Sequence, residues 1–206
     1  MFVTAEVRWF YPDECPANLH RWWFGETSPA PGGGKLRVDE YLSQTDQSEM
    51  SAKIRGERSG LEIKGLVAVC RSEAVPFAPY VELWCKWSLQ ASALEITKKM
   101  IVQKTRWLRT YDATRAYIVE IPLQADEKPL NGQPLPRQGC NVEITKVQLA
   151  EDPQQWWTLG FEAFGDLNSA PANLQMTAQY LIAQSIPLPS SGEFMNYPAW
   201  LARIKS

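Results

Sequence analysis

The sequence predicts an α+β protein built on an eight-stranded antiparallel β-barrel, a tunnel with two or three flanking helices. About eight segments alternate apolar and polar residues with a period of two, as strands do. Most of these segments are joined by short connections, which favours antiparallel neighbours. Eight strands are enough to close a barrel and remove the edges of the sheet.

Several of the predicted strands place charged residues on one face and large apolar residues on the other. In residues 3–9, Thr4, Glu6 and Arg8 share a face. Residues 53–55 and 61–64 form a hairpin around a turn that ends at Gly60. The remaining predicted strands are residues 35–42, 80–87, 101–111, 116–123, 140–149 and 156–164.

Helical spacing of apolar residues is found between and after the strands. A short helix is predicted over residues 16–24, and a second over 88–99, where a serine caps the start. Leu174, Thr177 and Leu181 predict a helix over 173–184, with Pro171 just before it. One or two helical turns over 197–204 close the chain.

Length and composition bound the class of protein. A chain of 206 residues is expected to form a single domain over residues 1–206. The formal net charge of −2 provides no global basic field, so a nucleic-acid partner is not expected. The sequence has no signal-peptide pattern and no apolar stretch long enough to span a membrane, which predicts a cytoplasmic protein with reduced thiols.

The charged faces decide what the barrel does. Most of the predicted strands carry a cation or a carboxylate in the middle of the polar face. The charged residues are Glu6, Arg8, Lys53, Arg55, Glu62, Lys64, Glu82, Lys86, Lys104, Arg106, Glu120 and Glu143. If these faces point inward, the barrel is a charged tunnel; if they point outward, they are an ordinary wet surface.

The ordered set of strand motifs resembles the CYTH superfamily, also called triphosphate tunnel metalloenzymes. The motifs are TAEVR at 4–8, DEYL at 39–42, KIR at 53–55, LEIK at 61–64, KTR at 104–106 and VEIT at 142–145 after Gly139. Each motif alone is short, and the order over nearly the whole chain carries the resemblance. Thr4 and Thr145 stand where the family has further glutamates.

The resemblance implies a metal-dependent hydrolase of a triphosphate, which would be inorganic triphosphate, a nucleoside triphosphate or thiamine triphosphate. It implies Glu6 and Arg8 as catalytic residues, with water as the nucleophile. The metal, Mg²⁺ or Mn²⁺, would be held by Glu6, Glu120 and Glu143. The implied substrate-binding residues are Arg8, Lys53, Arg55, Lys64, Lys86, Lys104 and Arg106.

Two other functions fit the same sequence. The cations could bind a phosphorylated or polyanionic small molecule without catalysis. In contrast, a calycin-like barrel that binds an apolar molecule would need the charges outside, with Trp9, Trp84, Trp87 and Trp107 lining the interior. The direction in which Lys64 and Arg106 point separates these interpretations.

Overall fold

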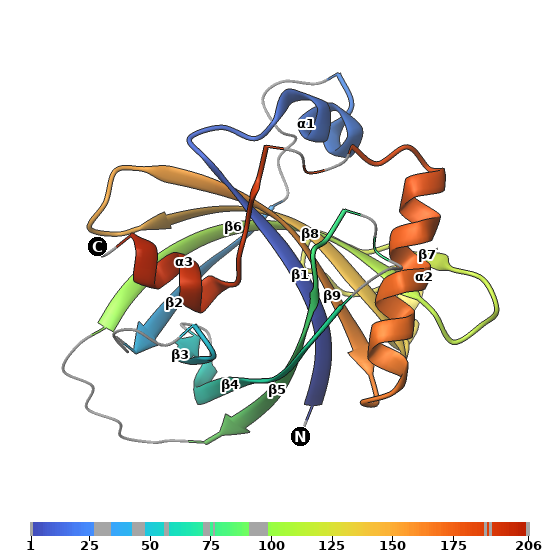
Figure 1. The fold of residues 1–206 in the computed structure, drawn as a ribbon, viewed down its shortest axis with the longest axis horizontal. Coiled ribbons are helices and arrows are strands. Elements are labelled where there is room, and N and C mark those ends of the chain that lie inside the picture. Colours follow the sequence, from blue (N-terminus) through green and yellow to red (C-terminus); the bar gives the residue numbers. More distant parts are fainter. Residues whose placement is uncertain are drawn as a thin grey trace.

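The computed structural model describes residues 2–26, 34–42, 48–55, 58–71, 75, 77–90, 99–187, 189 and 191–204 (Figure 1). Of residues 55, 58, 59 and 131, only the backbone is described. The strands in these segments are β1 (Phe2–Pro12), β2 (Lys35–Leu42), β3 (Met50–Arg55), β4 (Arg58–Cys70), β5 (Val81–Leu89), β6 (Lys99–Asp112), β7 (Val119–Ile121), β8 (Gly139–Leu149), β9 (Gln155–Gly165) and β10 (Glu193–Phe194). The helices are α1 (Ala17–Phe24), α2 (Ser169–Ala183) and α3 (Tyr197–Arg203), with a 3-10 turn at Leu130–Gly132.

Eight of the described strands close into a barrel. Their order is β1–β5–β4–β3–β2–β6–β8–β9, and β9 pairs back onto β1. All the pairings in this ring are antiparallel. The short strands β7 and β10 lie outside the ring, beside the ends of β6 and β1. The predicted antiparallel barrel with flanking helices is therefore confirmed.

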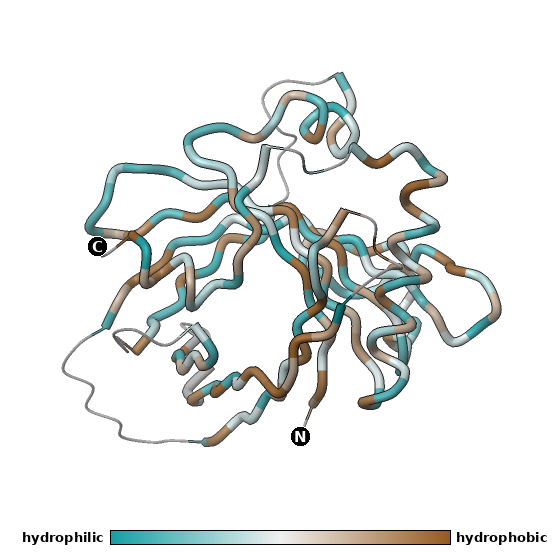
Figure 2. Tube along the Cα trace, viewed as in Figure 1, coloured by the Kyte–Doolittle hydropathy of each residue, from teal (hydrophilic) through white to brown (hydrophobic). Residues whose placement is uncertain are grey.

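Because side chains alternate along each strand, the polar residues line the inside of the barrel. On the side formed by β1, β8 and β9, the apolar residues lie on the outside. On β1, Glu6 and Arg8 point into the barrel, whereas Ala5, Val7 and Trp9 are buried on the outside. Helix α2 covers this outer face and packs against β1, β8 and β9 (Figure 1). Figure 2 shows the resulting alternation of hydrophilic and hydrophobic residues along the strands.

Helix α3 closes one end of the barrel interior. Trp200 is completely buried and stacks on Phe10 with ring centroids 5.3 Å apart. The apolar residues of this cluster, which we call the plug, are Phe10, Tyr41, Val102, Val147, Trp156, Trp200 and Leu201. The plug residues that lie on strands share a face with the charged residues, and Trp200 and Leu201 of α3 pack against them, so the interior has an apolar half and a charged half.

Four predicted elements differ from the structure. Residues 58–60, predicted to lie in the hairpin turn, belong to β4. Ser88 belongs to β5 and Lys99 to β6, while residues 91–98 of the predicted helix lie outside the described residues. The predicted strand over 116–123 is reduced to Val119–Ile121, and it ends at Pro122, which has no N–H to donate to a sheet. Helix α2 begins before Pro171, which the first turn of a helix accepts for the same reason.

Candidate functional site

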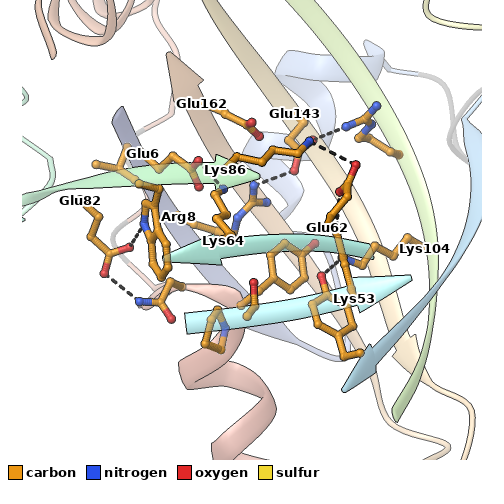
Figure 3. Close-up of a pocket in the computed structure, with 18 of the residues that line it drawn as sticks. Glu6, Arg8, Lys53, Glu62, Lys64, Glu82, Lys86, Lys104, Glu143 and Glu162 are labelled. Carbon is orange, nitrogen blue, oxygen red and sulfur yellow. Dashed lines mark hydrogen bonds and ion pairs between the residues drawn. The ribbon is translucent and has the colours of Figure 1, made fainter. Parts of the chain in front are cut away.

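The charged half of the barrel holds a cavity of about 80 Å³ (Figure 3). Cationic side chains from six strands line it: Arg8, Arg37, Lys53, Lys64, Lys86, Lys104 and Arg106. Carboxylates also line it: Glu6, Glu62, Glu82, Glu143 and Glu162. Among the described lining residues, the formal cations therefore exceed the carboxylates by two.

Asp39 is the centre of the most cationic part of this wall. Its carboxylate is completely buried and lies 3.0 Å from the Arg37 Nε, 3.0 Å from the Lys53 Nζ and 3.2 Å from the Lys104 Nζ. Burial by itself would raise the pKa of Asp39, but these cations outweigh it and hold that pKa well below its usual range. Glu62 adds a second carboxylate 4.0 Å from the Lys53 Nζ, but it lies closer to Lys86, at 3.3 Å, so this wall has more cationic than anionic groups.

The excess of cations affects the pKa of Lys104. It is 2% exposed, donates a hydrogen bond to the Tyr41 hydroxyl at 2.8 Å, and lies 3.6 Å from the centroid of the Tyr197 ring. Burial lowers the pKa of Lys104 well below its usual value, and Asp39 offsets this only in part. A bound anion would favour the charged amine, because it supplies the negative charge that the wall lacks.

Glu143 is held by two arginines from different strands. Its Oε1 accepts from the Arg8 Nη2 at 2.7 Å, and its Oε2 accepts from the Arg106 Nη1 at 3.2 Å. Burial opposes the charged form, but the two guanidinium groups lower the pKa of Glu143 well below its usual range. Gly160 of β9 lies between Arg8 on β1 and Glu143 on β8. A Cβ at this position would come within 2.5 Å of the Arg8 guanidinium.

Glu6 and Glu162 form a second carboxylate group on neighbouring strands. They are direct cross-strand partners on β1 and β9, and both line the cavity (Figure 3). Glu6 contacts Lys64 and accepts a hydrogen bond from Thr4. Burial raises the pKa of Glu6 and Glu162 raises it further, although Lys64 acts in the opposite direction. The pKa of Glu162 is lowered, since Lys64 and Lys86 outweigh its burial.

Glu127, in the loop between β7 and β8, pairs with Arg106 from outside the lining of the charged cavity. The Arg106 Nε donates to Glu127 Oε1 at 2.8 Å, and Lys35 lies 3.8 Å from the same carboxylate. Burial by itself would lower the pKa of Arg106, but Glu143 and Glu127 raise it, so this guanidinium stays charged.

Most of the predicted site residues meet in the cavity. Those that line it are Glu6, Arg8, Lys53, Lys64, Lys86, Lys104, Arg106 and Glu143. The side chain of Arg55 lies outside the described residues. Lys64 and Arg106 point inward, and Trp9 and Trp107 pack on the outside. Of the tryptophans expected in an apolar lumen, Trp84 does line the cavity, but it lies there among charged side chains, so the charges are not on the outside as that interpretation requires.

Glu120 does not reach this site. Its side chain is 45% exposed on β7, outside the ring, and its nearest cation is Arg109 at 3.9 Å. The predicted metal ligands Glu6, Glu120 and Glu143 are therefore not brought together. In the described part of the chain, no cluster of three or more His, Cys, Asp or Glu residues is arranged to hold a metal ion.

The sequence prediction gave no role to Asp39 or Glu162, and it did not consider Arg37 or Tyr197 as site residues. Glu162 could have been found from strand parity, because it shares the inward face of β9 with Thr158 and Gly160. Tyr197 had no such signal, since it reaches the cavity from helix α3.

Comparison of the chain with protein-family models and with curated proteins gives no match. None of the helices in the described residues is long and apolar enough to cross a membrane.

Proposed function

We propose that the barrel binds a phosphorylated or polyphosphate small molecule in the charged cavity. The observation that carries this proposal is the wall around Asp39, where Arg37, Lys53 and Lys104 share one carboxylate. Phosphate oxygens are strong acceptors for Lys and Arg, and they supply the missing negative charge. A charge pair at 4 Å gains roughly 4 kcal/mol at an effective dielectric constant of 20. Binding alone needs no catalytic carboxylate. Glu143 is paired with two arginines, which agrees with a structural role for it.

Tripolyphosphate without metal should raise the melting temperature of the protein. A hundredfold excess over Kd stabilises the folded state by about 2.7 kcal/mol, which is a shift of roughly 5–10 °C for a chain of this size. Lys53→Met and Lys86→Met should each reduce the shift, because both side chains line the cavity. The measurement is differential scanning fluorimetry, with each variant compared with its own ligand-free melting temperature.

Lys99→Met is the matched control for these variants. Lys99 pairs with Glu40 and does not line the cavity, so its removal should leave the shift unchanged. No shift in the wild-type protein, or equal shifts in all three variants, would contradict the proposed function.

Metal-dependent hydrolysis of the bound triphosphate is the second candidate, and the pairing of Glu6 with Glu162 favours it. Mg²⁺ is commonly held by one or two carboxylates together with substrate phosphates, so these two side chains fit the ion better than the predicted set does. When bound, such an ion would polarise the phosphoryl oxygens. The residues themselves would orient the phosphates, with Arg8 and Lys64 beside the carboxylates.

Glu162→Gln should lower Mg²⁺- or Mn²⁺-stimulated phosphate release from tripolyphosphate at least tenfold, while metal-free binding is retained. The assay is colorimetric phosphate release with and without the metal. Glu82→Gln is the control, because Glu82 is the cross-strand partner of Glu6 on the other side. The Glu82 carboxylate accepts hydrogen bonds from Trp84 and Asn196 instead. Equal release by both variants would contradict a metal site at Glu162.

A further inference from the structure

Among the described lysines, Lys104 alone is fully buried, yet it lines the charged cavity. Its Nζ lies 3.2 Å from Asp39 Oδ2, and the Lys53 Nζ lies 3.0 Å from the same oxygen atom. Two ammonium groups that share one oxygen so closely repel each other. The side chain of Lys53 is 16% exposed and that of Lys104 is 1% exposed, so Lys104 is the amine that gives up its proton.

A lysine that has lost its proton is a nucleophile. Burial lowers the pKa of Lys104 well below its usual value and the neighbouring cations lower it further, although Asp39 offsets part of this. Removal from water and a nearby cation are the two means by which proteins prepare a lysine for Schiff-base formation. In contrast, the pKa of Lys64 in the same cavity is raised, since its partner Glu6 outweighs its burial.

The groups around the Lys104 amine suit the reaction of an amine with a carbonyl group. The Tyr41 hydroxyl accepts a hydrogen bond from the Lys104 Nζ at 2.8 Å, so its own proton is directed to another acceptor. Burial raises the pKa of Tyr41 well above its usual value, and the hydroxyl therefore keeps that proton. Asp39 lies on the other side of the amine, where it stabilises a positive charge on the nitrogen. The ring of Tyr197, with its centroid 3.6 Å from the Nζ, closes the inner end of this space.

From this geometry, and resting on the proposed function, we propose that the ligand is a phosphorylated aldehyde or ketone and that Lys104 forms a Schiff base with it. The phosphate binds the cations of the same cavity, among them Lys53 and Arg37, and this places the carbonyl carbon beside the Lys104 amine.

The proposed reaction at Lys104 has two stages. The amine nitrogen forms a bond to the carbonyl carbon, and one amine proton moves to the carbonyl oxygen, which gives a carbinolamine. The bond between that carbon and its oxygen then breaks, and the oxygen leaves as water with the second amine proton. The products are an imine on Lys104 and one water molecule. Tyr41 donates a hydrogen bond to the oxygen that leaves.

The test uses glycolaldehyde phosphate, with glycolaldehyde as the matched probe that lacks the phosphate. Sodium cyanoborohydride reduces any imine to a stable amine, and peptide mass spectrometry measures the rate of labelling at each lysine. At Lys104, glycolaldehyde phosphate should react at least tenfold faster than glycolaldehyde, because the cavity holds its phosphate. Lys128 is the internal reference, since its side chain is 77% exposed, and it should react with both probes at rates within twofold. Tripolyphosphate should slow the labelling of Lys104 at least tenfold and leave that of Lys128 unchanged.

Tyr41→Phe keeps the ring but removes the hydroxyl, so it should slow the labelling of Lys104 about tenfold, while tripolyphosphate still raises the melting temperature of this variant. Lys99→Met, which changes an outer ion pair, is the control and should label Lys104 at the wild-type rate.

The comparison of the two probes on wild-type protein decides the question even where a variant does not fold. The inference is overturned if wild-type protein binds tripolyphosphate while Lys104 stays unlabelled, or if both probes label Lys104 at equal rates. Failure to bind tripolyphosphate, together with equal labelling by the two probes, overturns the proposed function too, so the two failures are distinguishable.

Discussion

Asp39→Asn is expected to lower the free energy of unfolding by about 3–5 kcal/mol, because it leaves buried cations without their counter-charge. The substitution keeps the size of the side chain but removes the one negative charge shared by Arg37, Lys53 and Lys104. Because Asp39 is completely buried, water cannot replace the lost carboxylate. Urea unfolding at pH 7, followed by circular dichroism, measures the change.

Glu40→Gln is the matched control, since Glu40 is the next residue of the same strand. Its side chain is 32% exposed and pairs with Lys99 on the outer face of the barrel. Exposed pairs contribute about 0–1 kcal/mol, so this variant should stay close to wild type. Similar losses in the two variants would contradict a special role for the buried carboxylate.

The loss of stability in Asp39→Asn should depend on pH. The pKa of Asp39 is lowered in the folded state, so its stabilising effect is complete above the unfolded pKa of about 4. This effect is lost as the pH falls below that value toward the folded pKa. The difference in unfolding free energy between wild type and Asp39→Asn should therefore shrink between pH 7 and pH 3. Glu143 adds to the loss of wild-type stability in acid, whereas Glu6, with its raised pKa, partly offsets it.

Strand parity explains why much of the cavity could be predicted from the sequence. Lys53, Lys64 and Lys86 lie on three strands, and the period of two fixes their common face once the barrel closes. Which face points inward is not a local property, because it depends on what covers the outside. Here, α2 buries the apolar face of β1, β8 and β9, so the charged face must be the inner one.

The remaining parts of the site depend on strand order. The wall around Asp39 forms because β2 lies between β3 and β6 in the ring. The pairing of β2 with β6 joins strands that are far apart in the sequence, so the pattern within each strand does not predict it. Glu120 shows the opposite case, since it interrupts an apolar run that predicts a strand, but that strand pairs outside the ring. The plug also depends on a long-range contact, in which α3 at the end of the chain packs against Phe10 at its beginning.

Trp200→Ala should lower the free energy of unfolding by about 3–5 kcal/mol, because it empties the centre of that plug. The Trp200 side chain is completely buried and contacts the rings of Phe10, Trp156 and Tyr197. The same change should weaken tripolyphosphate binding, since Tyr197 of α3 lines the cavity and faces Lys104.

Urea unfolding and calorimetry measure these two effects of Trp200→Ala, and the exposed Trp87 provides the comparison. Trp87→Ala removes the same side chain from the outer surface and should cost about 1 kcal/mol or less. If Trp200→Ala destabilises the protein by as little as Trp87→Ala does, α3 does not close the barrel in solution. If stability falls but the affinity for tripolyphosphate is unchanged, the plug is structural only and does not position the anion-binding wall.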